Sequence, residues 1–182
     1  MNADCDRHLF VIFGATGDLT TRKLLPALYR VVTENGVADR AVILGVASKE
    51  MTEDAYRDLA HDALADAGFV DHDCATWCRD RIFYQQVPRG AALDDLAARI
   101  TAHETEMALP GNRAFYLALP PVAFPSTIER LGIAGLNRAE GWTRLVIEKP
   151  FGEDLESAHA LNQLAHSYFD ESQIYRIDLY LG

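Results

Sequence analysis

The segment GATGDLTTRKLLPALY, residues 14–29, has the residue types and the spacing of a loop that binds phosphate. Gly14 and Gly17 allow a tight turn and a close approach of the backbone to a pyrophosphate, and Thr16 adds a hydroxyl donor. The N–H groups and the positive dipole end of the following helix hold the negative charge. Thr20 stands where the common dinucleotide fingerprint has a third small residue. We therefore predict that a dinucleotide binds here. The alternative is a plain strand-to-helix turn with an aspartate as the helix cap.

The residues after the second apolar run indicate which dinucleotide binds. An NAD site usually has Asp or Glu at the end of the second strand, where the carboxylate accepts a hydrogen bond from the ribose 2′-hydroxyl. A 2′-phosphate instead requires a cation or neutral donors. The run ends in GVASKE, so Ser48 and Lys49 occupy the decisive positions, with Glu50 adjacent. This pattern favours NADP. A solvated lysine with no role in binding is the alternative interpretation of position 49.

His72, Cys74 and Cys78 lie close together in HDCATWC, and all three are residue types that bind zinc. Zinc sites usually have four ligands, and no second pair of ligands follows at a suitable distance in the sequence. We therefore predict no metal site and interpret the two cysteines as small apolar residues on a loop. With Cys5 the cysteines number three, which does not suit a disulfide framework.

An alternation of short β-rich runs and longer helical patterns must position these residues. The expected strands are 8–13, 41–47, 81–87, 113–119, 143–148 and 173–178. The expected helices lie near 18–35, 52–67, 91–108, 122–134 and 153–168. Strands that are apolar along their whole length are buried on both faces. We therefore predict an α/β fold in one domain, residues 1–182, with a doubly wound, Rossmann-type parallel sheet and helices on both faces.

Composition restricts the class of protein. The net charge of −10 argues against a nucleic-acid partner, because a phosphate backbone attracts a basic surface. The start, MNADCDRHLF, lacks the basic residues and apolar run of a signal peptide. The most apolar later stretch, AFYLALPPVAF, is about half the ~20 residues that a membrane helix requires. We expect a cytoplasmic protein with no membrane partner.

Three stretches resemble the N-terminal coenzyme domain of the glucose-6-phosphate dehydrogenase family. They are GATGDLTTRKLLPAL (14–28), RLVIEKPFGEDLESA (144–158) and YRIDLYLG (175–182), and NRAFYLALPPVAFP (112–125) also fits. The resemblance implies NADP-dependent oxidation of glucose 6-phosphate to 6-phosphogluconolactone, the reaction that begins the oxidative pentose phosphate pathway. The expected partners are therefore the nicotinamide dinucleotide and glucose 6-phosphate.

The resemblance also implies roles for individual residues. The expected cofactor-binding residues are Gly14, Ala15, Thr16, Gly17, Asp18, Leu19, Ser48, Lys49, Phe124 and Lys149. Lys149 would bridge the cofactor and the sugar, and Lys23 would lie near the substrate. Asp178 would orient a catalytic histidine that acts as general base, because a carboxylate fixes the tautomer of an imidazole. Tyr180 would donate a hydrogen bond to the sugar phosphate.

Two substitutions depart from the family pattern. Ser48 replaces an arginine, so the 2′-phosphate loses its best bidentate partner, which Lys49 only partly replaces. Leu179 replaces a histidine of the substrate site. The sequence also lacks the β-rich half that carries the catalytic histidine in the family, so we expect the 182-residue chain alone to be inactive. The alternative function is an inactive NADP(H)-binding module or a truncated paralogue. We further expect self-association through the exposed C-terminal strand, or pairing with a full-length relative.

Overall fold

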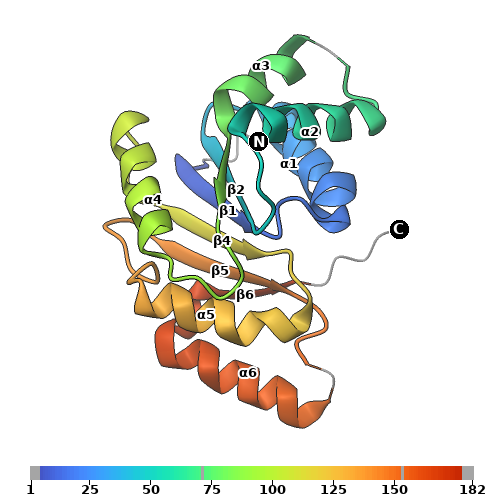
Figure 1. Cartoon of the computed structure of the whole chain (residues 1–182). Coiled ribbons are helices and arrows are strands. Elements are labelled where there is room, and N and C mark those ends of the chain that lie inside the picture. The colour runs from blue at the N-terminus through green and yellow to red at the C-terminus, as the bar shows by residue number, and fades with distance from the viewer. Residues whose placement is uncertain (1–4, 71, 153, 178–182) are drawn as a thin grey trace.

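The computed structural model describes residues 5–70, 72–152 and 154–177. These residues form a six-stranded sheet in which every strand pair is parallel, with helices on both faces (Figure 1). The strand order is β3-β2-β1-β4-β5-β6. It is the order of doubly wound dinucleotide-binding sheets, so the predicted fold class is confirmed.

Each predicted strand is present, with small differences at the ends. The strands are β1 (His8–Phe13), β2 (Ala41–Ala47), β3 (Ile82–Gln86), β4 (Arg113–Leu117), β5 (Thr143–Glu148) and β6 (Ile174–Ile177). The helices are α1 (Leu25–Glu34), α2 (Glu53–Asp66), α3 (His72–Arg81), α4 (Asp94–Glu106), α5 (Phe124–Ile133) and α6 (Leu155–Tyr168). Shorter turns are the π-helical η1 (Thr20–Leu24) and the 3-10 helices η2 (Pro121–Ala123) and η3 (Glu171–Gln173).

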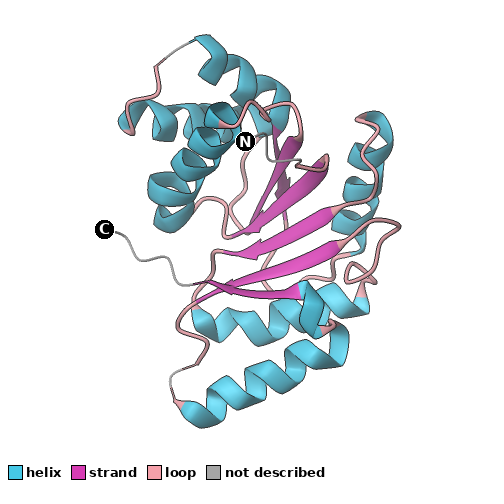
Figure 2. Cartoon of the chain, turned by 180° about the vertical axis from the view of Figure 1, so that it is seen from behind, coloured by secondary structure: helices cyan, strands magenta, loops and turns pink. Residues whose placement is uncertain are grey.

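The two faces of the sheet bury separate cores. Successive side chains of a strand point to opposite faces, so Val11 of β1 packs in one core and Ile12 in the other. Helices α4, α5 and α6 cover the face of Val11, and α1, α2 and α3 cover the face of Ile12 (Figure 2). The central strands are therefore buried on both faces, which is the pattern predicted from their apolar sequences.

Helix α3 corrects one prediction. The segment around Cys74 and Cys78 is a helix and not a loop, and both thiols are buried in the core on that face of the sheet. Burial, followed by the neighbouring Cys74, raises the pKa of the Cys78 thiol to about 12. His72 is exposed at the start of the helix. Across residues 5–70, 72–152 and 154–177, no group of three His, Cys, Asp or Glu is placed to hold a metal ion.

A charged network joins α2 to α4. Arg99 of α4 donates to the Glu53 carboxylate at 2.6 Å and, through Nε, to His103 Nε2 at 3.0 Å. Glu53 also pairs with Arg57 at 2.9 Å. The His103 ring is 3% exposed and lies 4.4 Å from the Phe83 ring, centroid to centroid. These contacts link α4 to α2 and to β3, which is an edge strand of the sheet.

In the part of the chain that the structure describes, no helix has the length and apolar character needed to cross a membrane.

Candidate functional site

The turn after β1 is held by its neighbours on both sides. The N–H groups of Gly14 and Ala15 donate to the Val46 carbonyl of β2, at 2.9 and 3.2 Å. Gly14 has a φ of +85°, and a Cβ built on it would lie 2.1 Å from the Ala118 carbonyl oxygen. Only glycine fits this position. A glycine is therefore needed at position 14 because the chain after β4 passes so close to it.

The helix that follows begins at Asp18. The Gly14 carbonyl accepts hydrogen bonds from the N–H of Gly17 and from the Thr20 hydroxyl, both at 3.0 Å. Thr20 is buried, so its hydroxyl holds the turn and is not presented to a ligand. A Cβ on Gly17 would have the Gly14 oxygen, at 3.2 Å, as its neighbour within 4 Å among the described atoms. The backbone at Gly17 is therefore open, and a phosphate can approach the start of the helix.

A cleft of about 480 Å³ lies beside this turn. It sits at the carboxyl ends of β1 and β4, which are neighbours in the sheet but lead to helices on opposite faces. Ligands of open α/β sheets bind at such a switch point. The cleft is lined by Phe13, Gly14, Thr16, Gly17, Val46, Ala47, Ser48, Val87, Pro88, Arg89, Gly90, Ala118, Leu119, Pro120, Val122, Ala123, Ser126, Thr127 and Arg130.

The end of β2 contributes Ser48 to this lining, but Lys49 is not among the described residues that line the cleft. Both residues are exposed, and their backbone is fixed from β3. The Tyr84 hydroxyl donates to the Lys49 carbonyl at 2.5 Å, and the Gln86 amide donates to the Ser48 carbonyl at 3.4 Å. The geometry therefore favours Ser48 over Lys49 as the residue of this strand that meets a ligand.

Two arginines that sequence reasoning missed line the cleft. Arg89 follows β3, and Arg130 lies on α5. Arg130 donates to the carbonyls of Ala91, at 2.8 Å, and Ser126, at 3.2 Å. No acidic residue is among the described residues of the lining, so its charged groups are cationic. The strand order could have indicated that Arg89 lines the cleft, since it places the end of β3 beside the end of β2.

The remaining predicted residues have varied positions. Ala15 is buried under the turn, where its carbonyl accepts from the Tyr56 hydroxyl at 3.4 Å, and Leu19 is half-buried. Phe124, at the start of α5, is 1% exposed and packs in the core, outside the cleft lining. Lys23 is exposed on η1. Asp178, Leu179 and Tyr180 lie outside the described residues.

Lys149 directly follows β5, so it lies at the carboxyl ends of the parallel strands, where the cleft also lies. Its N–H donates to the Ile177 carbonyl at 3.1 Å, and the Lys149–Pro150 peptide is cis. The preceding carboxylate, of Glu148, accepts a hydrogen bond from the Tyr116 hydroxyl of β4. The backbone around Lys149 is thus tied to strands on both sides.

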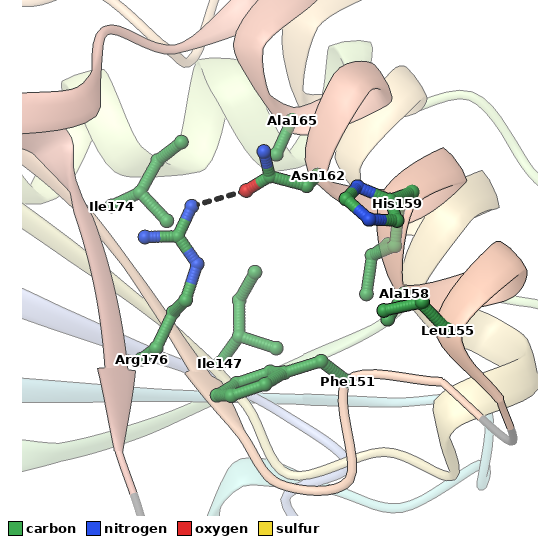
Figure 3. Close-up of a pocket in the computed structure, with 10 residues that line it drawn as sticks. Ile147, Phe151, Leu155, Ala158, His159, Asn162, Ala165, Ile174 and Arg176 are labelled. Carbon is green, nitrogen blue, oxygen red and sulfur yellow. Dashed lines mark hydrogen bonds between the residues drawn. The ribbon is translucent and has the colours of Figure 1, made fainter.

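A second hollow, of about 230 Å³, lies between α6 and the ends of β5 and β6. Figure 3 shows Ile147 and Phe151 on one side of it and the α6 residues on the other, with Arg176 donating to Asn162. Its lining is mostly apolar. The Phe151 side chain of EKPFG therefore lies in this hollow and does not line the cleft at the glycine turn.

Comparisons with known proteins agree with this geometry. A family model described as "Glucose-6-phosphate dehydrogenase, NAD binding domain" matches residues 11–182. The glucose-6-phosphate 1-dehydrogenase of Aggregatibacter actinomycetemcomitans is 39% identical over 175 residues, which cover 94% of this chain and 35% of that protein. The Bacillus subtilis protein of the same name is 36% identical over 178 residues, covering 97% of this chain and 36% of that protein.

Solved structures give the same result. A glucose-6-phosphate dehydrogenase in complex with its substrate glucose-6-phosphate superposes with a TM-score of 0.84 at 30% identity, covering 95% of this chain and 36% of that one. The glucose-6-phosphate 1-dehydrogenase of Mycobacterium avium superposes with a TM-score of 0.78 at 32% identity, covering 94% and 36%. The chain therefore spans roughly a third of the length of these relatives.

Proposed function

The chain belongs to the glucose-6-phosphate dehydrogenase family, whose NAD binding domain it matches over residues 11–182, and from this premise we propose that it forms the coenzyme-binding part of an NADP-dependent enzyme. The proposed reaction oxidises glucose 6-phosphate at C1 to 6-phosphogluconolactone. Accepting the hydride is the chemistry that the nicotinamide supplies when it is bound. The observation that carries the proposal is the cleft at the switch point of the sheet, with the glycine turn at one side.

The residues of the cleft fit a dinucleotide. The open backbone at Gly17 and the start of the helix at Asp18 suit a pyrophosphate, and the Thr16 side chain adds a hydroxyl donor at the same place. Gly14 has no room for a side chain because the chain after β4 approaches it, so this glycine serves the shape of the turn beside the cleft. These residues would hold the coenzyme.

The preference for NADP is supported by charge. A 2′-phosphate carries negative charge and would be repelled by an acid at the end of β2. That position holds Ser48, and the described lining of the cleft contains Arg89 and Arg130 but no Asp or Glu. The lining therefore favours the phosphorylated coenzyme.

The substrate side of the proposal rests on the position of Lys149. It directly follows β5, at the carboxyl ends of the strands where the cleft lies, and this position is what supports a contact of its side chain with both coenzyme and sugar. Lys23, exposed on η1, is proposed near the sugar. Asp178 and Tyr180 keep the proposed roles of orienting the base and binding the sugar phosphate.

A calorimetric titration of the 182-residue protein with NADP⁺ and with NAD⁺ tests the proposal. We expect micromolar binding of NADP⁺ and at least roughly tenfold weaker binding of NAD⁺, the difference given by one charge-assisted contact. Equal affinities would contradict the NADP preference. Absence of heat from both nucleotides would reject coenzyme binding itself.

Leu179 favours a second candidate function, a module that binds NADP(H) without catalysis. An isobutyl group cannot donate to a sugar phosphate, whereas the histidine of the family can. Because the chain alone is expected to be inactive under either candidate, the test mixes it with a full-length relative whose own coenzyme site has been disabled. NADP⁺ binding without NADPH formation from glucose 6-phosphate in that mixture would favour the module. Turnover of glucose 6-phosphate in the mixture would reject it.

Self-association through β6 is a further part of the proposal. Within the described residues β6 pairs with β5 only, and Tyr175 on it is 43% exposed. Exposed edge strands pair readily with a second copy. Sedimentation velocity at rising protein concentration would show a growing larger species, and a purely monomeric boundary would contradict the proposal.

A further inference from the structure

Arg89 is the cationic side chain of the cleft that remains available to a ligand. It is exposed, and among residues 5–70, 72–152 and 154–177 no acidic group forms an ion pair with it. Arg130, by contrast, already donates to two carbonyl groups. An exposed guanidinium without a carboxylate partner has all its donors free for an anion.

The loop that carries Arg89 is fixed beside the end of β2. The Val87 N–H donates to the Ala47 carbonyl at 2.9 Å, which continues the β2–β3 pairing to the residue before Ser48. The Ala91 N–H then closes the turn on the Pro88 carbonyl at 3.1 Å. Arg130 holds the Ala91 carbonyl from α5 at 2.8 Å. Arg89 is therefore presented within the same cleft wall as Ser48.

The chemistry at this place is that of the ribose 2′ position. In doubly wound sheets the end of the second strand meets the 2′ substituent of the coenzyme. Ser48 offers a hydroxyl there but no charge, and Lys49 is outside the described lining of the cleft. A guanidinium makes two parallel hydrogen bonds to a phosphate, which a serine hydroxyl does not.

We infer that Arg89, on the loop after β3, binds the 2′-phosphate of the coenzyme and so determines the preference for NADP. The inference rests on the proposed function, since it assigns a part of the same coenzyme site. It replaces the expectation that Lys49 makes up for the missing arginine at position 48.

The test compares Arg89→Ala with Lys49→Ala in titrations with NADP⁺, NAD⁺ and 2′,5′-ADP. Arg89→Ala is expected to weaken NADP⁺ and 2′,5′-ADP binding by roughly tenfold to a hundredfold, because a charge-assisted contact is lost. NAD⁺ binding should change by less than about twofold, since NAD⁺ lacks the 2′-phosphate. Lys49→Ala should leave all three affinities within about threefold. Arg89→Lys should be intermediate, because it keeps the charge and loses the bidentate geometry.

The outcomes separate the two proposals. If the unmutated chain binds NADP⁺ and Arg89→Ala binds it equally well, the inference is overturned while the proposed function stands. A loss confined to Lys49→Ala overturns the inference in favour of Lys49. A parallel loss of NAD⁺ binding in Arg89→Ala also overturns it, because a general defect is not 2′-phosphate selection. If the unmutated chain binds neither nucleotide, the proposed function fails and the inference falls with it. Unchanged circular dichroism and urea unfolding of Arg89→Ala would establish that the exposed position does not affect folding.

Discussion

The hydroxyl of Tyr116 in β4 donates a hydrogen bond to the carboxylate of Glu148, the last residue of β5. Tyr116 is 3% exposed, and its ring centroid lies 5.8 Å from that of Phe10. Burial raises the pKa of Tyr116, and the hydrogen bond and charge of Glu148 add to the effect. The hydroxyl therefore stays protonated and remains a donor. The pair fixes the end of β5 immediately before Lys149.

Tyr116→Phe should destabilise the protein by about 1–3 kcal/mol, because it leaves the half-buried Glu148 carboxylate without this donor. The free energy of unfolding in urea measures the effect. Tyr175→Phe is the matched control, since it removes the same atom from an exposed side chain and should change stability by less than about 0.5 kcal/mol. Equal stability of the two variants would show that the hydrogen bond contributes nothing.

Gly14→Ala should destabilise the fold by roughly 3 kcal/mol or more, since its methyl group would overlap the Ala118 carbonyl in a backbone conformation that favours glycine. Gly36→Ala provides the control. Gly36 also has a positive φ, +64°, but no described atom lies within 4 Å of its added Cβ, so only the backbone cost of roughly 1–2 kcal/mol applies. Thermal unfolding of both variants separates the two contributions. Similar melting temperatures would contradict the importance of the Ala118 contact.

Stability should fall as pH rises above about 9, because of Cys78. The unfolded chain releases the thiol proton near the ordinary pKa of 9.0, whereas the folded chain keeps it until the raised pKa of about 12. A raised pKa in the folded state gives stability that is complete below the unfolded pKa and lost above it. Urea unfolding at pH 8, 9 and 10 measures the slope. Cys78→Ala should have a smaller slope between pH 9 and 10, and an unchanged slope would refute the assignment.

His103 should weaken the fold at acid pH. Burial, and then the charge of Arg99, lower its pKa from 6.5, while Glu53 and Glu106 oppose this. As pH falls below 6.5 the unfolded chain takes up the proton and the folded chain resists it, so stability is present above that pH and lost below it. His103→Gln should lose less stability between pH 7 and pH 5 than the unmutated chain. His159→Gln, at an exposed position of α6, should behave like the unmutated chain.

The alternation of apolar runs was sufficient to predict every strand and the fold class, because strands buried on both faces have a distinct pattern. It failed at α3. That helix has only three buried residues, Cys74, Trp77 and Cys78, among charged and polar neighbours, so its apolar face is too narrow to stand out. Cys74 and Cys78 are four residues apart, which places both on one face of a helix, so this spacing is compatible with a helix as well as with the predicted loop.

Local sequence predicts the glycine turn, whereas strand order decides which other residues line the cleft. The glycine turn is local, and Thr16 and Gly17 line the cleft as a binding role requires. Arg89 and the Tyr116–Glu148 pair depend on which strands are neighbours and in what register, and one sequence does not contain that information. Phe124 differs from both cases. The resemblance implies that it contacts the cofactor, whereas the structure places its side chain in the core.

The cleft contains one position that the fold requires, Gly14 beside the Ala118 carbonyl, and other positions at which a ligand is expected to be selected. At the glycine turn, backbone meets backbone, so no exchange of a neighbouring side chain can make room for a larger residue. Elsewhere in the cleft lining, Ser48 and Arg89 are exposed side chains outside the two core clusters. The positions that the fold requires are therefore different from those to which we assign the coenzyme preference. If Ser48 and Arg89 select the coenzyme as proposed, substitutions at these two positions are expected to change the preferred nicotinamide coenzyme and to leave the folded state intact.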